Sequence, residues 1–333
     1  MKIVFHSAYL GFRGTEVALM DYAWGNRALL GHESLFLLPW RQDAEQHPVV
    51  PVMQKTAPVR FYKNADEREA ILREEGADFF YCVKNGFNDG VFSRTVPTGI
   101  HAIFRESEFH GDVYAYISGW LSRVMAYGQA AVAPWMVRLA ETDGDFRQDL
   151  GIPTGARVFG RHGGEDSFDL PWVQEAVVQA ARNDSHLWFL FLNTREFGGP
   201  RRPSNLRFLP GTADPETKRM FLNTCDAMIH GRQRGETLGM ACLEFALLGK
   251  PVLTYAGSPE QAHLEILGDM AVAYHNAQGL RKVLEDLGQG SEFAGQRPES
   301  HRPPPFPGKH TNEKFKEYQP EAVMQKFEQV FLR

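Results

Sequence analysis

Two glutamates, Glu236 and Glu244, stand eight positions apart within residues 225–257, and their type and spacing could serve a chemical function. At a helical rise of 1.5 Å per residue they would lie at most roughly 12 Å apart, about the span of a nucleotide sugar from hexose to ribose. A carboxylate accepts two hydrogen bonds from vicinal hydroxyls, and the first amides of a helix attract an anion. One segment could therefore hold a sugar, its phosphates and a ribose. The alternative is that both glutamates are ordinary solvated carboxylates.

The pattern around these glutamates predicts the elements that must position them. The run CDAMIH is typical of a short buried strand, and the polar loop GRQRGET follows it. Apolar residues at helical spacing then predict a helix over LGMACLEFALL, which Gly249 ends. The run PVLTYA predicts a second strand. Strand, loop, helix and strand in this order indicate a parallel α/β sheet.

The complete order of strand, glycine loop, Glu-Thr-Leu-Gly, Glu and Gly-Lys-Pro-Val is more specific than the glutamate spacing. It resembles the GT-B retaining glycosyltransferases of the large nucleotide-sugar family that includes phosphatidylinositol mannosyltransferases and glycogen synthases. In that family the loop glutamate contacts the donor sugar, and the helix glutamate contacts the ribose. The resemblance assigns these roles to Glu236 and Glu244. The amides of Thr237, Leu238 and Gly239, together with Met240, would face the donor pyrophosphate.

The same resemblance implies further donor contacts, at Gly14 and Thr15 in the first loop and at Arg161 after the strand ARVFG. G-x-x-G in the first loop lacks the glycines of the dinucleotide fingerprint, so from the residues alone a tight turn is the simpler interpretation. The family also has a lysine several residues after the arginine, and that position falls near Asp166. The charge of a leaving phosphate must be offset, so we expect Arg232 or Arg234 to compensate.

NLRFLPGTAD resembles the family stretch whose backbone contacts the base, which implies that Gly211 and Thr212 line the base pocket.

A histidine at a strand end is the family's group near the reacting sugar, and His110 in the loop RESEFHGD is the candidate here. His101 falls inside the preceding strand. The helix that usually separates this loop from the next strand is missing in this chain. A loop histidine bonded to its neighbours is the alternative role for His110. The polar loop after the strand FFYCV carries Lys84, Asn85 and Asp89. These residues either contact the acceptor or form the turn.

Composition narrows the class of protein. The 333 residues are 43% apolar, enough for two domains with their own cores, and the net charge of −5 argues against nucleic acid as a partner. The 3 cysteines fall in apolar runs and predict reduced core thiols, and no apolar run has the roughly 18 residues of a membrane span. With no signal peptide evident at the start, we expect a cytoplasmic protein without stable membrane insertion. The sequence does not determine an oligomeric state.

Asp143-Gly144-Asp145 matches the DxD of metal-dependent glycosyltransferases. It follows no predicted strand and precedes a predicted short helix ending at Gly151, where aspartate is an ordinary cap. We therefore expect neither a metal nor a cofactor.

The predicted fold is α/β of the GT-B type, with two Rossmann-like domains facing each other across a cleft. We expect an acceptor-side domain over 1–135, a nucleotide-sugar domain over 150–312, and a C-terminal helix over 313–333 that packs back toward the first domain. Residues 128–156 predict a linker without strands, and 288–312 an irregular segment rich in Gly, Pro and Ser.

The expected activity is metal-free transfer of a sugar, with retention of configuration, from a nucleoside-diphosphate sugar to a hydroxyl acceptor such as a glycan. The alternatives are a non-catalytic nucleotide-sugar or glycan-binding protein and a nucleotide-sugar epimerase of the same fold.

Overall fold

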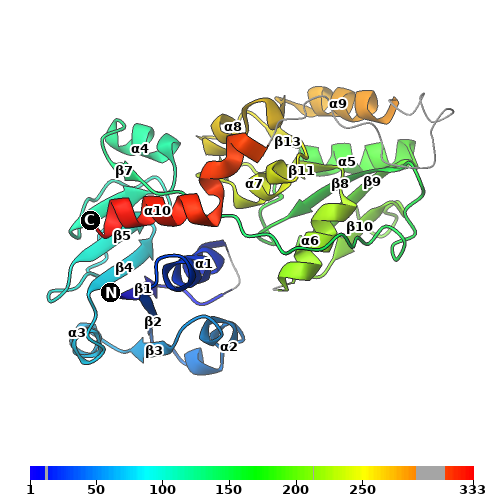
Figure 1. The fold of residues 1–333 in the computed structure, drawn as a ribbon. Coiled ribbons are helices and arrows are strands. Elements are labelled where there is room, and N and C mark those ends of the chain that lie inside the picture. The colour runs from blue at the N-terminus through cyan, green and yellow to red at the C-terminus, as the bar shows by residue number, and fades with distance from the viewer. Residues whose placement is uncertain (12–13, 213, 290–311) are drawn as a thin grey trace. The chain divides into compact units, whose positions relative to one another are not determined.

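The computed structural model describes residues 1–11, 14–212, 214–289 and 312–333. The chain forms two compact units (Figure 1). Unit 1 comprises Met1–Arg138 and Lys316–Arg333, and unit 2 comprises Leu139–Phe315.

Unit 1 is a parallel sheet of seven strands in the order β3-β2-β1-β4-β5-β6-β7. Its elements along the chain are β1 (Lys2–Ser7), α1 (Gly14–Ala28), β2 (Glu33–Pro39), α2 (Val49–Gln54), β3 (Val59–Tyr62), α3 (Ala65–Glu74), β4 (Phe79–Lys84), β5 (Thr98–Ala102), β6 (Val113–Tyr116), α4 (Gly119–Ala126), β7 (Ala131–Val132) and α10 (Pro320–Phe331).

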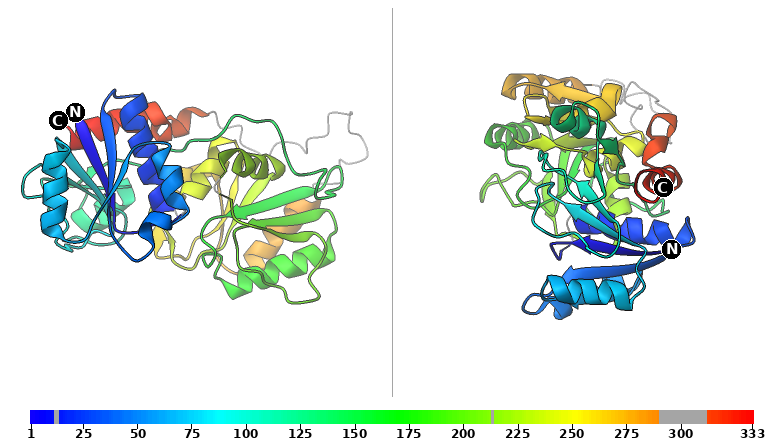
Figure 2. Two further views of the ribbon diagram at one scale, coloured as in Figure 1. Left: turned by 90° about the horizontal axis from the view of Figure 1, so that it is seen from below. Right: turned by 90° about the vertical axis from the view of Figure 1, so that its left-hand side faces the viewer.

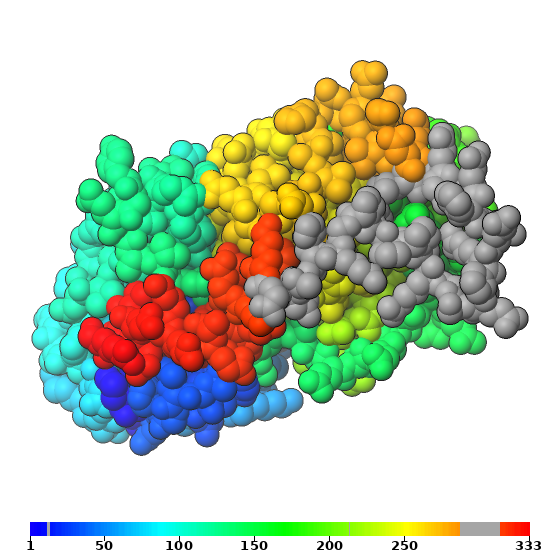
Figure 3. Space-filling model, turned by 45° about the horizontal axis from the view of Figure 1, so that its top comes forward, coloured from blue at the N-terminus to red at the C-terminus, as the bar shows by residue number. Residues whose placement is uncertain are grey.

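Alternation of side chains along the strands gives this sheet two buried faces. On β1, Val4 joins a cluster that includes Leu72 of α3. The next residue, Phe5, packs instead against Phe327 of α10, at a ring distance of 6.3 Å. Helices α1 and α10 lie side by side on this second face, although the whole chain separates them in sequence (Figures 1 and 3).

Unit 2 repeats the design with a parallel six-stranded sheet in the order β10-β9-β8-β11-β13-β15. The strands and helices of unit 2 are the green to orange ribbons in Figure 2. Its elements are β8 (Arg157–His162), α5 (Pro171–Asn183), β9 (Leu187–Leu192), β10 (Leu206–Leu209), α6 (Pro215–Thr224), β11 (Ala227–His230), β12 (Gly235–Glu236), α7 (Met240–Leu247), β13 (Val252–Tyr255), β14 (Glu260–Gln261), α8 (Ala262–Leu267), β15 (Ala271–Tyr274) and α9 (Ala277–Gln289).

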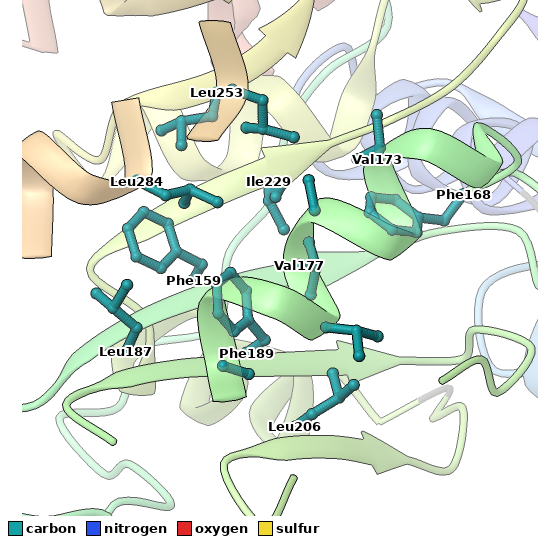
Figure 4. Packing of buried hydrophobic residues seen from close by; sticks show 14 of the residues in the cluster. Phe159, Phe168, Val173, Val177, Leu187, Phe189, Leu206, Ile229, Leu253 and Leu284 are labelled. Atoms are coloured by element: carbon teal, nitrogen blue, oxygen red, sulfur yellow. The ribbon is translucent and has the colours of Figure 1, made fainter. Parts of the chain in front are cut away.

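The main core of unit 2 lies where α5 and α9 cover one face of this sheet. Val177 of α5 and Leu284 of α9 point toward Phe159, Phe189 and Ile229 of the strands (Figure 4). Helices α6 and α7 contact β8, β11 and β13. Burial of these apolar side chains fixes the strand ends, and therefore the loops that carry the polar residues described below.

In each sheet the strand order reverses beside the first strand, between β1 and β4 in unit 1 and between β8 and β11 in unit 2. Open parallel sheets bind ligands at the carboxyl ends of the strands that flank such a reversal. The fold therefore marks one ligand-binding edge in each unit.

The predicted α/β class with two Rossmann-like units is confirmed, and the three cysteines are free and buried as expected. The linker differs from the prediction. A two-residue strand, β7, lies within residues 128–156, and turns replace the short helix expected before Gly151. Helix α3 buries Glu69. Of the segment predicted as irregular, residues 290–311 lie outside the described residues.

Candidate functional site

The carboxyl ends of β8 and β11 bring together the polar residues of unit 2. Strand β8 ends with Arg161 and His162, and β11 ends with His230. The two strands are neighbours in the sheet. The loop after β11 carries Glu236, and α7 carries Glu244. These residues therefore lie on the edge where the fold predicts a ligand.

A small two-stranded pairing holds Glu236 in place. Residues Gly235–Glu236 form β12, in parallel register with Glu260 and Gln261 of β14. Gly235 has a φ of 79°, and a Cβ at this position would lie 1.9 Å from the carbonyl oxygen of Glu260. Only glycine permits this approach.

Helix α7 begins at Met240, two residues later than predicted, because Gly239 occupies the N-cap with a φ of 92°. Thr237, Leu238 and Gly239 are buried and precede the helix. The expected amide-lined site thus consists of a loop followed by the helix start.

The Glu236 carboxylate has two partners on the β11 side of the sheet. Oε1 lies 3.2 Å from Nε2 of His230, and Oε2 accepts a hydrogen bond of 2.7 Å from Arg232. Burial opposes ionisation, but the bond from His230 and the charge of Arg232 outweigh it and lower the carboxyl pKa to about 2. With 22% of its side chain exposed, Glu236 is an ionised acceptor that a ligand can reach.

Behind Glu236, a buried chain of hydrogen bonds continues through His230 to Thr254 and His263. Nδ1 of His230 lies 2.9 Å from Oγ1 of Thr254, and Oγ1 lies 3.0 Å from Nε2 of His263. Both Thr254 and His263 are fully buried.

The Glu244 carboxylate also has two partners, one on each oxygen. Lys218 of α6 donates to Oε1 at 2.6 Å, and Nε2 of His162 lies 2.7 Å from Oε2. Burial raises the carboxyl pKa, but Lys218 and His162 outweigh it and bring it to about 2. Only 6% of the Glu244 side chain is exposed, so its assigned role toward a ribose stays a prediction.

Arg161 is a buried cation whose hydrogen-bond partners are neutral. Nη1 donates to Thr194 Oγ1 at 2.5 Å, and Nη2 donates to Ser167 Oγ at 2.5 Å and to the carbonyl of Gly164 at 2.8 Å. Burial lowers the pKa of the guanidinium to about 10, and nearby Glu236 opposes that decrease. At about 10 the group is charged at neutral pH, and it attracts an anion.

The two arginines expected to replace the missing lysine each have a carboxylate partner. Arg232 pairs with Glu236, and Nε of Arg234 lies 2.8 Å from Glu260. Asp166, at the lysine position, pairs with Arg195 on the surface.

Gly211 and Thr212 follow β10 at the same carboxyl edge. A Cβ on Gly211 would lie 2.8 Å from the side-chain oxygen of Asn193. The side-chain Nδ2 of Asn193 donates to the carbonyl of Gly163 in the loop after β8. Thr212 Oγ1 accepts from the amide of Asp214 at 3.0 Å. The segment assigned to base binding thus adjoins the loop that surrounds Arg161.

In unit 1, Gly14 and Thr15 form the start of α1, after the loop that follows β1. Gly14 is exposed, and among the described residues, apart from its chain neighbours and its own helix backbone, no atom lies within 4 Å of a Cβ built on it. The loop before Gly14 and Thr15 follows β1, where the strand order reverses, as ligand-binding loops of parallel sheets do. The contact of these two residues with a donor stays a prediction.

Both ring nitrogens of His110 have partners within unit 1. Lys84 lies 2.9 Å from Nε2, and because an ammonium only donates, Nε2 is the acceptor. Nδ1 then donates to the carbonyl of Glu108 at 2.6 Å. Lys84 also pairs with Asp89. The structure thus gives His110 the contacts of a loop histidine, and a contact with the sugar requires it to exchange one of these partners.

Among the described residues, no three His, Cys, Asp or Glu side chains gather closely enough to hold a metal ion. Asp143-Gly144-Asp145 lies in a loop where Asp145 accepts from the amide of Arg147. In the described ranges, no helix combines the length and the apolar character needed to cross a membrane.

Sequence reasoning singled out Arg232, but it did not single out the other partners of the two glutamates, His162, Lys218 and His230, or the residues behind His230, Thr254 and His263. Two of them had a visible signal, because His162 and His230 are the last residues of strands that end at the reversal of the strand order. The other three become partners only through tertiary packing.

Neither protein-family models nor curated protein sequences gave a significant match. Solved structures do share the fold. Anabaena Alr3699/HepE in complex with UDP-glucose has a TM-score of 0.64 at 15% identity, covering 99% of this chain and 98% of that chain. AviGT4, a glycosyltransferase involved in avilamycin A biosynthesis, has a TM-score of 0.58 at 14% identity, covering 100% and 97%.

An epimerase has the same fold. UDP-GlcNAc 2-epimerase from Neisseria meningitidis bound to UDP-GlcNAc has a TM-score of 0.60 at 9% identity, covering 99% of each chain. These likenesses establish the GT-B fold for this chain.

Proposed function

We propose that the protein transfers a sugar from a nucleoside-diphosphate sugar to a hydroxyl acceptor, with retention of configuration and without a metal. The supporting observation is the carboxyl edge of unit 2, where the ionised carboxylate of Glu236 and the buried cation Arg161 lie beside the start of α7. Solved structures of the same fold include a glycosyltransferase and a complex with UDP-glucose.

The chemistry of the edge matches the parts of such a donor. Glu236 can accept hydrogen bonds from sugar hydroxyls, because a carboxylate has about four acceptor sites and only two are used. Arg161 and the amides around Leu238 bind the pyrophosphate. Glu244 binds the ribose, provided that the ligand adds to its bonds with Lys218 and His162 or displaces one of them.

In the transfer, the bond between the anomeric carbon and the diphosphate oxygen breaks, and a bond from the acceptor oxygen to the same carbon forms. The acceptor proton passes to the leaving phosphate oxygen on the same face of the sugar, so no nucleophile of the protein is needed. The protein's contribution is positioning and charge stabilisation. Arg161 offsets the charge that develops on the phosphate.

The remaining assignments belong to the same proposal. Gly14 and Thr15 approach the donor phosphate, Gly211 and Thr212 line the base pocket, and His110 stabilises the reacting sugar after it leaves Lys84 or Glu108. The acceptor is a glycan or another hydroxyl compound, and the protein acts in the cytoplasm.

Ligand-dependent thermal unfolding and turnover together test the proposal. A panel of nucleoside diphosphates and their sugars, beginning with UDP and UDP-glucose, should include a donor that raises the melting temperature by mass action. With that donor and a set of glycan acceptors, we expect release of nucleoside diphosphate and a glycosylated product. The variant Glu236→Ala should lose both, whereas Glu175→Gln, an exposed change on α5, should not. A panel without any stabilising nucleotide would refute the proposal.

Epimerisation is the second candidate, because an epimerase bound to its nucleotide sugar shares this fold. An epimerase would convert the donor sugar with no acceptor present, which product analysis of the same incubations detects. A protein that only binds would be stabilised by the donor and release no nucleotide.

A further inference from the structure

The contacts of Glu236 differ in rigidity, and this difference identifies the residue that orients it. Arg232 lies in the loop after β11, with 27% of its side chain exposed. His230 is the last residue of β11 and is 5% exposed. Because β11 pairs with both β8 and β13, His230 is fixed by the sheet, whereas Arg232 is not.

The protons of the buried chain follow from the state of Glu236. An ionised carboxylate only accepts, so Nε2 of His230 carries the hydrogen of this bond. In a neutral ring Nδ1 is then an acceptor, and the hydroxyl of Thr254 donates to it at 2.9 Å. That hydroxyl has no second hydrogen, so Nε2 of His263 donates to Thr254 at 3.0 Å.

We infer that His230 is the positioning residue of Glu236, and that Thr254 and His263 act behind it by selecting the Nε2–H form of its ring. Because the function of Glu236 toward the donor sugar is itself proposed above, this inference rests on that proposal. Both ring nitrogens of His230 are engaged, Nδ1 by Thr254 and Nε2 by Glu236. It acts through the carboxylate.

The environment of His263 agrees with its part in this arrangement. It is fully buried, and burial together with His230 lowers its pKa to about 3, so the ring is neutral at physiological pH. Its ring centroid lies 4.9 Å from that of His230. A neutral ring can fix the hydrogen of Thr254 without placing a second charge beside Arg232.

Local structure explains how His263 reaches this place. Gln261 pairs with Glu236 in the small sheet, and α8 brings His263 inward two residues later. A Cβ on Gly239 would lie 2.9 Å from Cβ of His263, so the glycine admits the histidine. The residues that fold Glu236 into position thus also bring His263 close to Thr254 and His230.

Isosteric changes at Thr254 test the inference. Thr254→Val keeps the shape and removes the hydroxyl, and we expect kcat for the donor identified above to fall about 10- to 100-fold, as for other residues that orient a reactive group. KM should change less than kcat. Thr254→Ser, which restores the hydroxyl, should recover most of the rate. His263→Gln, which keeps a donor near Nε2, should retain more activity than His263→Leu.

Thr224→Val is the matched control, because Thr224 is equally buried and its hydroxyl donates to the carbonyl of Met220 within α6. It should lower the melting temperature and leave kcat unchanged. Equal kcat values for Thr254→Val and Thr254→Ser would overturn the inference, as would a kcat loss in Thr224→Val equal to that in Thr254→Val.

Histidine ¹⁵N NMR separates this inference from the proposed function. In the wild-type protein, the ring of His230, assigned with His230→Gln, should show a protonated Nε2 and an unprotonated Nδ1, and Thr254→Val should change that pattern. If the wild-type protein turns over no donor, the proposed function fails. An Nδ1–H ring in the wild type, or a ring unaffected by Thr254→Val, would refute the inference whatever the turnover.

Discussion

Glu244→Gln should make unit 2 less stable at neutral pH and should remove the part of its acid sensitivity that this carboxyl group causes. The carboxyl pKa falls from 4.5 to about 2 on folding, because Lys218 and His162 outweigh burial. Each pKa unit corresponds to about 1.4 kcal/mol, so ionisation of Glu244 contributes about 3 kcal/mol at pH 7. The Gln side chain has the same shape but lacks the charge.

The sign follows from linkage. A carboxyl group with a lowered pKa in the folded state stabilises that state fully above pH 4.5, and the contribution disappears as the pH falls toward about 2. The free energy of unfolding of the variant should therefore lie about 3 kcal/mol below that of the wild type at pH 7. The two should approach each other as the pH falls.

Urea unfolding followed by the fluorescence of Trp172 and Trp188, both in unit 2, measures this difference at a series of pH values. Unit 1 also carries four tryptophans, so the background in which the unit 2 signal is isolated combines Trp24→Phe, Trp40→Phe, Trp120→Phe and Trp135→Phe. Glu175→Gln, an exposed change on α5, is the control and should track the wild type throughout. A difference between wild type and Glu244→Gln that stays constant from pH 7 to pH 3 would show that the charge of Glu244 is not the cause.

Three further changes test the packing and the anion site. Gly160→Ala should destabilise unit 2 by about 1–3 kcal/mol in chemical unfolding, because its Cβ would lie 2.2 Å from Sγ of Cys225, and the cost should shrink in a Cys225→Ala background. Gly239→Ala should cost about 1–2 kcal/mol from its φ of 92° alone and should also weaken donor binding in calorimetry, since Cβ would approach His263. Arg161→Lys should weaken UDP binding about tenfold in the same assay, because a lysine ammonium cannot reproduce the planar guanidinium that bonds to three acceptors. Unchanged UDP affinity would exclude Arg161 from the phosphate site.

Most strands and helices could be predicted because their signals are local. The exceptions have physical reasons. Helix α2 contains Pro51, which reads as a breaker in sequence but is tolerated in the first turn of a helix. Strand β7 is two residues long and forms only because β6 lies beside it. Residues 146–151 carry helix-forming side chains, yet they stay in turns.

The two glutamates could be located from sequence, whereas their electrostatic state could not. Lys218 on α6 and His162 on β8 reach Glu244 from 26 and 82 residues away in the sequence. For His110, the loop position was visible, but Lys84, which occupies its Nε2, lies at the end of another strand. Spacing identifies which residues share an edge, and only the packed sheet determines which of them neutralise one another.

The paired glutamates explain how such a site can be stable before a donor arrives. A buried carboxylate without a partner is costly, and the two basic side chains beside each of Glu236 and Glu244 offset that cost before a donor binds. Because a carboxylate has about four acceptor sites, the pairs leave room for hydroxyl groups without releasing a charge. Donor binding at Glu236 then requires little reorganisation, whereas Glu244, with 6% of its side chain exposed, must open further. The proposed function therefore implies that the sugar end of the site is preformed and that the ribose end adjusts when the nucleotide binds.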